Sequence, residues 1–97
     1  MVMHNPPHPG EFIRSVYLEP FGMSARALAH SLAVSPSTLN RVITGKSGIS
    51  PDMALRLSKA VGRTAESWLA MQDHYDLWQA KQHAELDHVQ HIEFAAA

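Results

Sequence analysis

Residues 24–45, SARALAHSLAVSPSTLNRVITG, contain two helix-sized segments separated by a short connection. Ser24 and Ser35 each precede a run of apolar residues at helical spacing, and Pro36 directly follows Ser35. A serine hydroxyl can accept a hydrogen bond from the free amides of a first helical turn, and proline is favoured at the first helical position. Gly45 supplies a permissive backbone where the second helix can end. We therefore expect two helices of about eight residues joined by roughly three or four residues.

The outer face of the second segment is polar in an unusual way. It carries Ser37, Thr38, Asn40, Arg41 and Thr44 in place of the Glu and Lys that favour an exposed helix. Two short helices that meet at such a turn are typical of a helix-turn-helix, in which the second helix enters the major groove of DNA. Short hydrogen-bonding side chains suit this role, because Asn can pair with adenine edges and Arg with guanine. A plain helical hairpin with a polar outer face is the alternative.

Further polar groups flank the second segment and could bind phosphates. They include the hydroxyls of Ser35 and Thr44, the side chains of Lys46 and Ser47, and the free amides of the first turn, where the helix dipole favours an anion. Such contacts would set the register on DNA without reading its sequence. The predicted DNA-binding residues are Ser35, Ser37, Thr38, Asn40, Arg41, Thr44, Lys46 and Ser47.

The net charge of −1 conceals an uneven distribution of charged residues. Residues 1–63 contain seven Lys and Arg against three Asp and Glu, whereas residues 64–97 contain one Lys against six acids. This asymmetry suggests that the first part of the chain meets an anionic partner and that the second part avoids it or meets a cationic one. A chance arrangement of solvated charges is the alternative interpretation.

The capping and helix-breaking residues in the rest of the chain predict an all-α fold with one domain. A first helix opens at residues 9–11 and ends at Pro20, and further helices follow the capping residues Ser50 and Thr64. With 97 residues the chain can bury one modest core. The apolar face predicted for the first helix consists of Phe12, Ile13, Val16 and Tyr17.

Aromatic side chains recur along the last predicted helix. Trp68, Met71, Tyr75 and Trp78 follow one another at spacings of three, four and three, which places them on one helical face. Trp68 and its neighbour Leu69 are expected in the core, whereas Tyr75 and Trp78 are candidates for a dimer interface, with core packing as the alternative for Trp78.

The chain is expected to divide into a loose N-terminal segment over residues 1–7, a helical domain over residues 8–80, and an acidic tail over residues 81–97. In the tail the helical pattern dissolves, and we expect either fraying or a helix that forms only with a partner. The acidic tail could attract a basic partner protein or serve only for solubility.

Catalytic and metal chemistry are not predicted. His8 and Glu11 could share a proton, but no nucleophile accompanies them, and a helix start explains the pair better. Of the seven histidines, His88 and His91 could face one way on a helix, yet they lack a third ligand at a suitable spacing. The chain has no cysteine, so it can form neither disulfides nor thiolate metal sites. We expect a cytoplasmic protein without cofactors, since no export or membrane segment is recognisable.

Several motifs taken together resemble a known family. They are HPGE at 8–11, LEP at 18–20, LA at 28–29, GKSGISPDMALRLSKAVG at 45–62, WL at 68–69 and YDLW at 75–78. In order and spacing, this pattern over residues 8–80 is similar to the HigA/VapI family of antitoxins, which belongs to the lambda-repressor-like, XRE-type helix-turn-helix proteins.

The resemblance implies a five-helix DNA-binding domain that acts as a homodimer on an inverted-repeat operator and represses its own operon. It also implies a partner, a HigB-type toxin that cleaves mRNA and is related to RelE. Residues 35–44 match the recognition helix of the family, and Lys46 lies in the loop after it. A stand-alone transcriptional regulator of the same fold is the alternative, because the family includes members with no known toxin.

Overall fold

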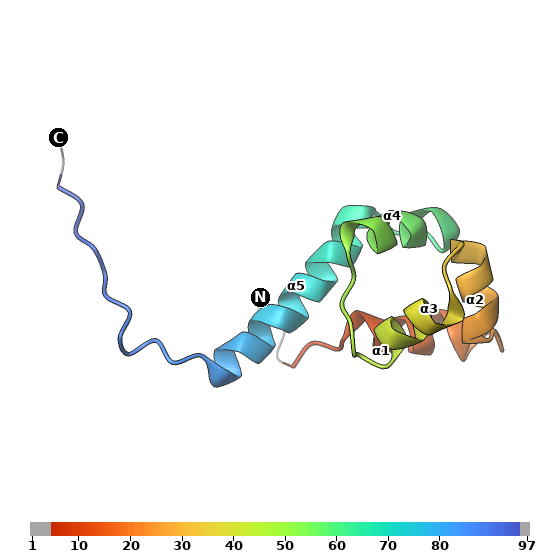
Figure 1. Cartoon of the computed structure of the whole chain (residues 1–97), viewed down its shortest axis with the longest axis horizontal. Coiled ribbons are helices and arrows are strands. Elements are labelled where there is room, and N and C mark those ends of the chain that lie inside the picture. The colour runs from red at the N-terminus through yellow and green to blue at the C-terminus, as the bar shows by residue number, and fades with distance from the viewer. Residues whose placement is uncertain (1–4, 96–97) are drawn as a thin grey trace.

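The computed structural model describes residues 5–95 and contains no strand in that range. Four short helices and the first half of a long fifth helix form the body, and the rest of the fifth helix projects from it (Figure 1). This architecture confirms the predicted all-α, five-helix fold. The elements are α1 (Pro9–Ile13), the π-helical segment η1 (Arg14–Leu18), α2 (Ala25–Leu32), α3 (Pro36–Ile43), α4 (Pro51–Ala60) and α5 (Ala65–His83).

Side-chain caps start the last four helices at the positions predicted from the sequence. Each capping oxygen accepts a hydrogen bond from the backbone amide three residues later, which satisfies one of the free amides of the first turn. The capping residues are Ser24, Ser35, Ser50 and Thr64, at distances of 3.0–3.1 Å.

The cap of α1 is a histidine. The Nδ1 atom of His8 accepts a hydrogen bond of 2.9 Å from the backbone amide of Gly10, so the predicted helix start is confirmed. Burial lowers the pKa of His8 below its ordinary value, although the carboxylates of Asp76 and Glu11 act in the opposite direction. Because protonation would oppose folding, His8 supports the fold fully above its ordinary pKa, and this support is lost as the pH falls toward the lowered value.

The first helix differs from its predicted form, because a π-helical turn follows α1. The amide of Glu19 donates to the carbonyl of Arg14 at 2.9 Å, a pairing over five residues in place of four. The wider turn changes the direction of the side chains. Leu18 is therefore buried, whereas Val16, which was predicted on the apolar face, is 39% exposed. The prediction for Val16 is wrong, since it assumed a regular helical period.

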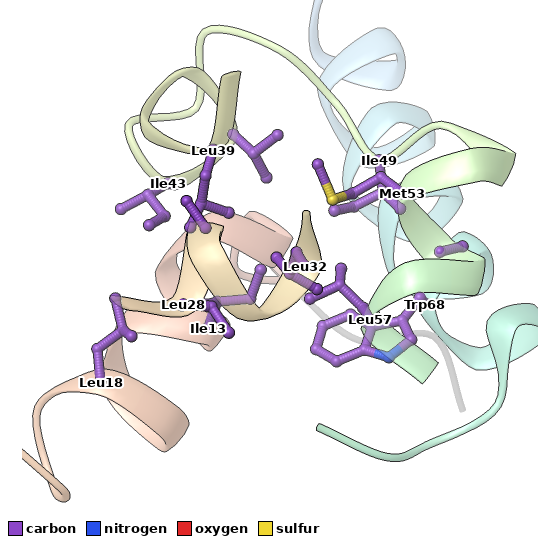
Figure 2. Close-up of a cluster of buried hydrophobic side chains, with 13 residues drawn as sticks. Ile13, Leu18, Leu28, Leu32, Leu39, Ile43, Ile49, Met53, Leu57 and Trp68 are labelled. Carbon is purple, nitrogen blue, oxygen red and sulfur yellow. The ribbon is translucent and has the colours of Figure 1, made fainter. Parts of the chain in front are cut away.

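The core lies where all the helices meet (Figure 2). Trp68 from α5 is fully buried, as predicted, and its indole nitrogen donates to the carbonyl of Gly62 at 3.1 Å. Leu69 is half-buried and packs against this core. The buried hydrophobic residues are Ile13, Leu18, Leu28, Ala29, Leu32, Leu39, Val42, Ile43, Ile49, Met53, Ala54, Leu57 and Trp68.

Helix α1 approaches the end of α3 at the level of the backbone. A Cβ atom added to Gly10 would overlap the carbonyl oxygen of Val42 and would lie 2.8 Å from the Cα atom of Ile43. Only glycine permits this approach, so α1 supports α3 from the side opposite its polar face.

The chain beyond α5 forms an extended segment, residues 84–95, which we call the arm (Figure 1). Every residue of the arm is exposed, and no regular helix continues past His83. Helix α5 thus includes the first three residues of the predicted acidic tail over residues 81–97. The division of the chain into these segments stays a prediction. Of the predicted loose segment, residues 1–4 lie outside the described residues, and Pro6 is buried. Within residues 5–95 no helix is long and apolar enough to cross a membrane.

Gly10→Ala is expected to destabilise the protein by about 2 kcal/mol or more. The added methyl group forces α1 and α3 apart, and this effect outweighs the gain of up to about 1 kcal/mol in helix propensity. Urea denaturation followed by circular dichroism measures the change. The exposed neighbour Glu11, changed to Ala, serves as the control. Equal midpoints for the two variants would contradict the close approach.

Candidate nucleic-acid interface

Helices α2 and α3 have eight residues each and are joined by residues 33–35, as the sequence predicts. Ala33 ends α2 in the left-handed conformation, with a φ of 58°. The amides of Ala33 and Val34 bond back to carbonyls in the last turn of α2. This left-handed cap turns the chain sharply, so that α3 starts at an angle to α2.

An arginine from α4 holds the turn from outside. The Nη1 atom of Arg56 donates to the carbonyls of Leu32 and Ala33 at 2.9 and 3.2 Å. Its Nε atom donates to Asp52, one helical turn earlier, at 2.7 Å. The guanidinium therefore satisfies carbonyls that the end of α2 leaves without helical partners. Sequence analysis missed this contact, which joins residues 24 positions apart.

Helix α3 has two distinct faces. Leu39, Val42 and Ile43 are buried against the body of the protein. The predicted DNA-binding residues on the opposite side are exposed, so their polar groups point away from the protein. These exposed residues are Ser35, Ser37, Thr38, Asn40, Arg41 and Thr44.

Three hydroxyl groups gather at the start of α3. The Ser35 hydroxyl lies 2.8 Å from that of Thr38 and 3.2 Å from that of Ser37. At the other end of α3, the hydroxyl of Thr44 donates to the carbonyl of Asn40 at 2.8 Å. These hydroxyls are oriented by the protein itself and keep lone pairs or a proton for an outside partner.

The longer polar side chains on α3 are available for an outside partner. Within residues 5–95 no hydrogen bond or ion pair engages the side chains of Asn40 or Arg41. Both side chains are exposed one helical turn from the start of α3. An amide and a guanidinium in this position can form the paired hydrogen bonds that read adenine and guanine.

The loop after α3 is held firmly at both ends. The amides of Lys46 and Ser47 donate to the carbonyl of Arg41 at 2.8 and 3.0 Å. The amide of Ile49 donates to the side chain of Gln72 on α5 at 2.8 Å. Lys46 is exposed, whereas Ser47 is half-buried and is the least accessible of the predicted contacts.

The buried side chain of Gln72 is a supporting residue that sequence analysis missed. Its amide nitrogen donates to Asp76 at 2.9 Å, which orients its oxygen toward the loop. A Cβ atom on Gly48 would lie 2.9 Å from Gln72, so the loop packs closely over this side chain. A polar residue within an apolar helical face is the only signal of this role in the sequence.

Helix α2 adds polar groups that we did not predict as DNA contacts. A groove between α2 and the start of α3 is lined by Arg26, His30 and Ser31, together with Pro36 at the start of α3. Arg26 was noted in the sequence only as part of the charge count. It lies in the groove next to Pro36, at the start of α3.

The candidate dimer residues lie on α5. Tyr75 is half-buried and meets the ring of His8 edge to face, with 4.9 Å between the ring centroids. Trp78 is also half-buried, one turn closer to the projecting end. Part of each ring stays accessible, and the role of both residues in a dimer stays a prediction.

The arrangement suits a ligand that is anionic and rich in hydrogen-bonding groups. A rigid helix presents hydroxyl, amide and guanidinium groups outward, with cations on the flanking segments. In the described part of the chain no group of three or more His, Asp or Glu residues could hold a metal ion.

The chain is similar to DNA-binding proteins of known structure. The helix-turn-helix family HTH_3 matches residues 16–69. Virulence-associated protein I of Dichelobacter nodosus is 52% identical over 75 residues, which are 77% of this chain and 69% of that protein. Pseudomonas aeruginosa antitoxin HigA, solved with the higBA promoter, is 37% identical over 89% of this chain and 96% of its own, with a TM-score of 0.78. Antitoxin GraA in complex with its operator is 38% identical over 95% of this chain and 93% of its own, with a TM-score of 0.80.

Arg56→Met is expected to lower the free energy of unfolding by about 1 kcal/mol, because the carbonyls that end α2 lose a charged donor and are partly compensated by water. Urea denaturation measures this change. Leu55→Ala on the same helix is the control, since Leu55 is 62% exposed. An Arg56 variant as stable as the wild type would show that the bonds to Leu32 and Ala33 do not hold the turn.

Proposed function

This chain belongs to the helix-turn-helix family HTH_3, and from its fold and relatives we propose that it is the antitoxin of a type II toxin–antitoxin module. In this function it binds operator DNA as a homodimer, represses its own operon and neutralises a HigB/RelE-like toxin that cleaves mRNA. It is a DNA-binding regulator and not an enzyme. Because operator DNA is reached from the cytoplasm, we propose that the protein acts there.

The observation that carries the proposal is the division of α3 into a buried and an exposed face. Leu39 is fully buried, while Asn40 and Arg41 directly after it are exposed. We assign α3 to the major groove, with Asn40 and Arg41 at base edges. Ser35, Lys46 and Ser47 contact phosphates in this arrangement, and they position the helix without reading the sequence.

A homodimer follows from the small size of the reading surface. One recognition helix of eight residues covers only a few base pairs. Two copies related by a twofold axis read two half-sites roughly 34 Å apart, so the operator is an inverted repeat. Tyr75 and Trp78, half-buried on α5, are candidates for the contact between the copies.

The antitoxin function is favoured over a stand-alone regulator because two similar DNA-bound structures, HigA and GraA, are named antitoxins. The charge distribution agrees with two partners of opposite charge, a basic protein and DNA. Residues 64–97 carry six acids and one Lys, which suits a basic protein that handles RNA. The cationic residues near α3 suit DNA.

The proposed function is tested with the adjacent gene and the promoter region. We expect a small neighbouring gene whose product stops growth when expressed alone, and we expect co-expression of this chain to restore growth. DNase I footprinting of the promoter is expected to protect two symmetric half-sites. Two outcomes contradict the proposal: no stable complex with the neighbour's product at micromolar concentration, or protection of a single asymmetric site.

Substitutions separate residues that read bases from residues that hold phosphates. Arg41→Ala and Asn40→Ala are expected to reduce discrimination between operator and unrelated DNA by about 1–3 kcal/mol each. Lys46→Ala is expected to weaken binding to both DNAs about equally and to reduce the salt dependence of binding. Fluorescence anisotropy over a range of salt concentrations measures these effects. If Arg41→Ala behaves as Lys46→Ala does, Arg41 contacts phosphate.

A further inference from the structure

An apolar groove runs between the N-terminal segment and the outer side of α5. Its volume is about 360 Å³. Its walls are largely apolar, and a cation and an imidazole lie among the lining side chains. The lining includes Pro6, Phe12, Arg63, Ala70, Met71 and His74.

The face of α5 that lines the groove continues toward the projecting end of the helix. Leu77 follows His74 by three residues and Ala70 by seven, so the three side chains share one helical face. Leu77 is 55% exposed, although its type favours burial. This stripe of α5 is therefore uncovered in the single chain.

The arm carries a matching set of uncovered apolar side chains. Leu86, Val89, Ile92 and Phe94 are each at least 62% exposed. The molecule measures 57 Å along its longest axis against 29 and 26 Å across it. Its radius of gyration of 17.1 Å exceeds the value of about 13 Å typical of a compact domain of this size. The arm thus extends into solvent, where its apolar side chains lie near one another and stay largely exposed.

The charges of the arm and the groove are complementary. The arm contains Glu85, Asp87 and Glu93 and no Lys or Arg. The guanidinium of Arg63 lies at the groove, 5.1 Å from the ring centroid of Phe12. In this position it can pair with a carboxylate that enters beside an apolar side chain.

We propose that the arm of one protomer docks in this groove on a second copy of the same chain. The arm of the second copy docks in the same groove on the first. The proposal rests on the homodimer of the proposed function and names its interface. When two α5 helices pack antiparallel about a twofold axis, the projecting end of each lies beside the groove-bearing half of the other. The aromatic face with Tyr75 and Trp78 then lies between the two bodies.

The direction of the arm favours the second copy over the protomer's own groove. The arm leaves α5 at His83 and continues away from the body (Figure 1). Its own groove lies behind it, since Met71 is twelve residues earlier and about 18 Å back along the helix. Docking there requires a full reversal after His83. Twelve extended residues span up to about 40 Å, which is enough to cross a neighbouring α5.

Disulfide trapping tests this exchange, and the absence of native cysteine makes the result specific. Ala70→Cys in the groove and Ile92→Cys in the arm are made in separate full-length chains with tags of different length, and the two chains are co-expressed. We expect a disulfide-linked heterodimer after mild oxidation on a non-reducing gel. The control pairs Ile92→Cys with Ser31→Cys on α2, which is exposed but remote from the groove, and it should form no such band.

A double variant distinguishes docking in the groove of the second copy from docking in the protomer's own groove. With Ala70→Cys and Ile92→Cys in one chain, we expect a dimer held by reciprocal disulfides. A monomer whose mobility changes on reduction would show that the arm folds onto its own groove, and this result would overturn the proposal. So would the absence of any disulfide between these two positions.

Sedimentation equilibrium gives a second, independent measurement. Phe94→Asp in the full-length chain is expected to raise the dissociation constant of the dimer at least tenfold, whereas Gln90→Asp, which adds the same charge to the arm, should change it little. If the wild type is a dimer and Phe94→Asp leaves it unchanged, arm docking is wrong while the proposed function stands. A wild type that is monomeric at all concentrations contradicts the homodimer itself.

Discussion

The buried side of α3 is the constraint on which the rest of the structure depends. An eight-residue helix is too short to be stable alone in water, so its conformation must come from packing. Leu39, Val42 and Ile43 supply that packing, and the backbone contact with Gly10 fixes the end of the helix. The outer face is left free because these contacts all lie on the other side.

Local signals made much of the fold predictable. A hydroxyl before an apolar helical run, often followed by proline, marks a helix start whatever lies elsewhere in the chain, and all four predicted caps are present. The exposure of the polar residues on α3 was predictable for the same reason, because helical period and apolar spacing determine which face is buried. The DNA contacts themselves stay predictions.

Features that depend on contacts across the chain were not predictable. The π-helical turn after α1 directs Leu18 into the core, and no rule of spacing indicates such a turn. The bonds of Arg56 to the end of α2 and of Gln72 to Ile49 join residues more than twenty positions apart. In the sequence these two side chains look like ordinary polar residues on helices, yet one binds the turn before α3 and the other binds the loop after it.

The two-faced character of α3 has an evolutionary consequence. Its exposed residues contribute almost nothing to the interior. If α3 reads the operator as we propose, mutations there alter which operator is recognised while the protein still folds. Duplicated copies of such a gene can acquire separate regulatory targets through a few substitutions on one surface. A genome can thereby maintain several modules of this kind without cross-regulation.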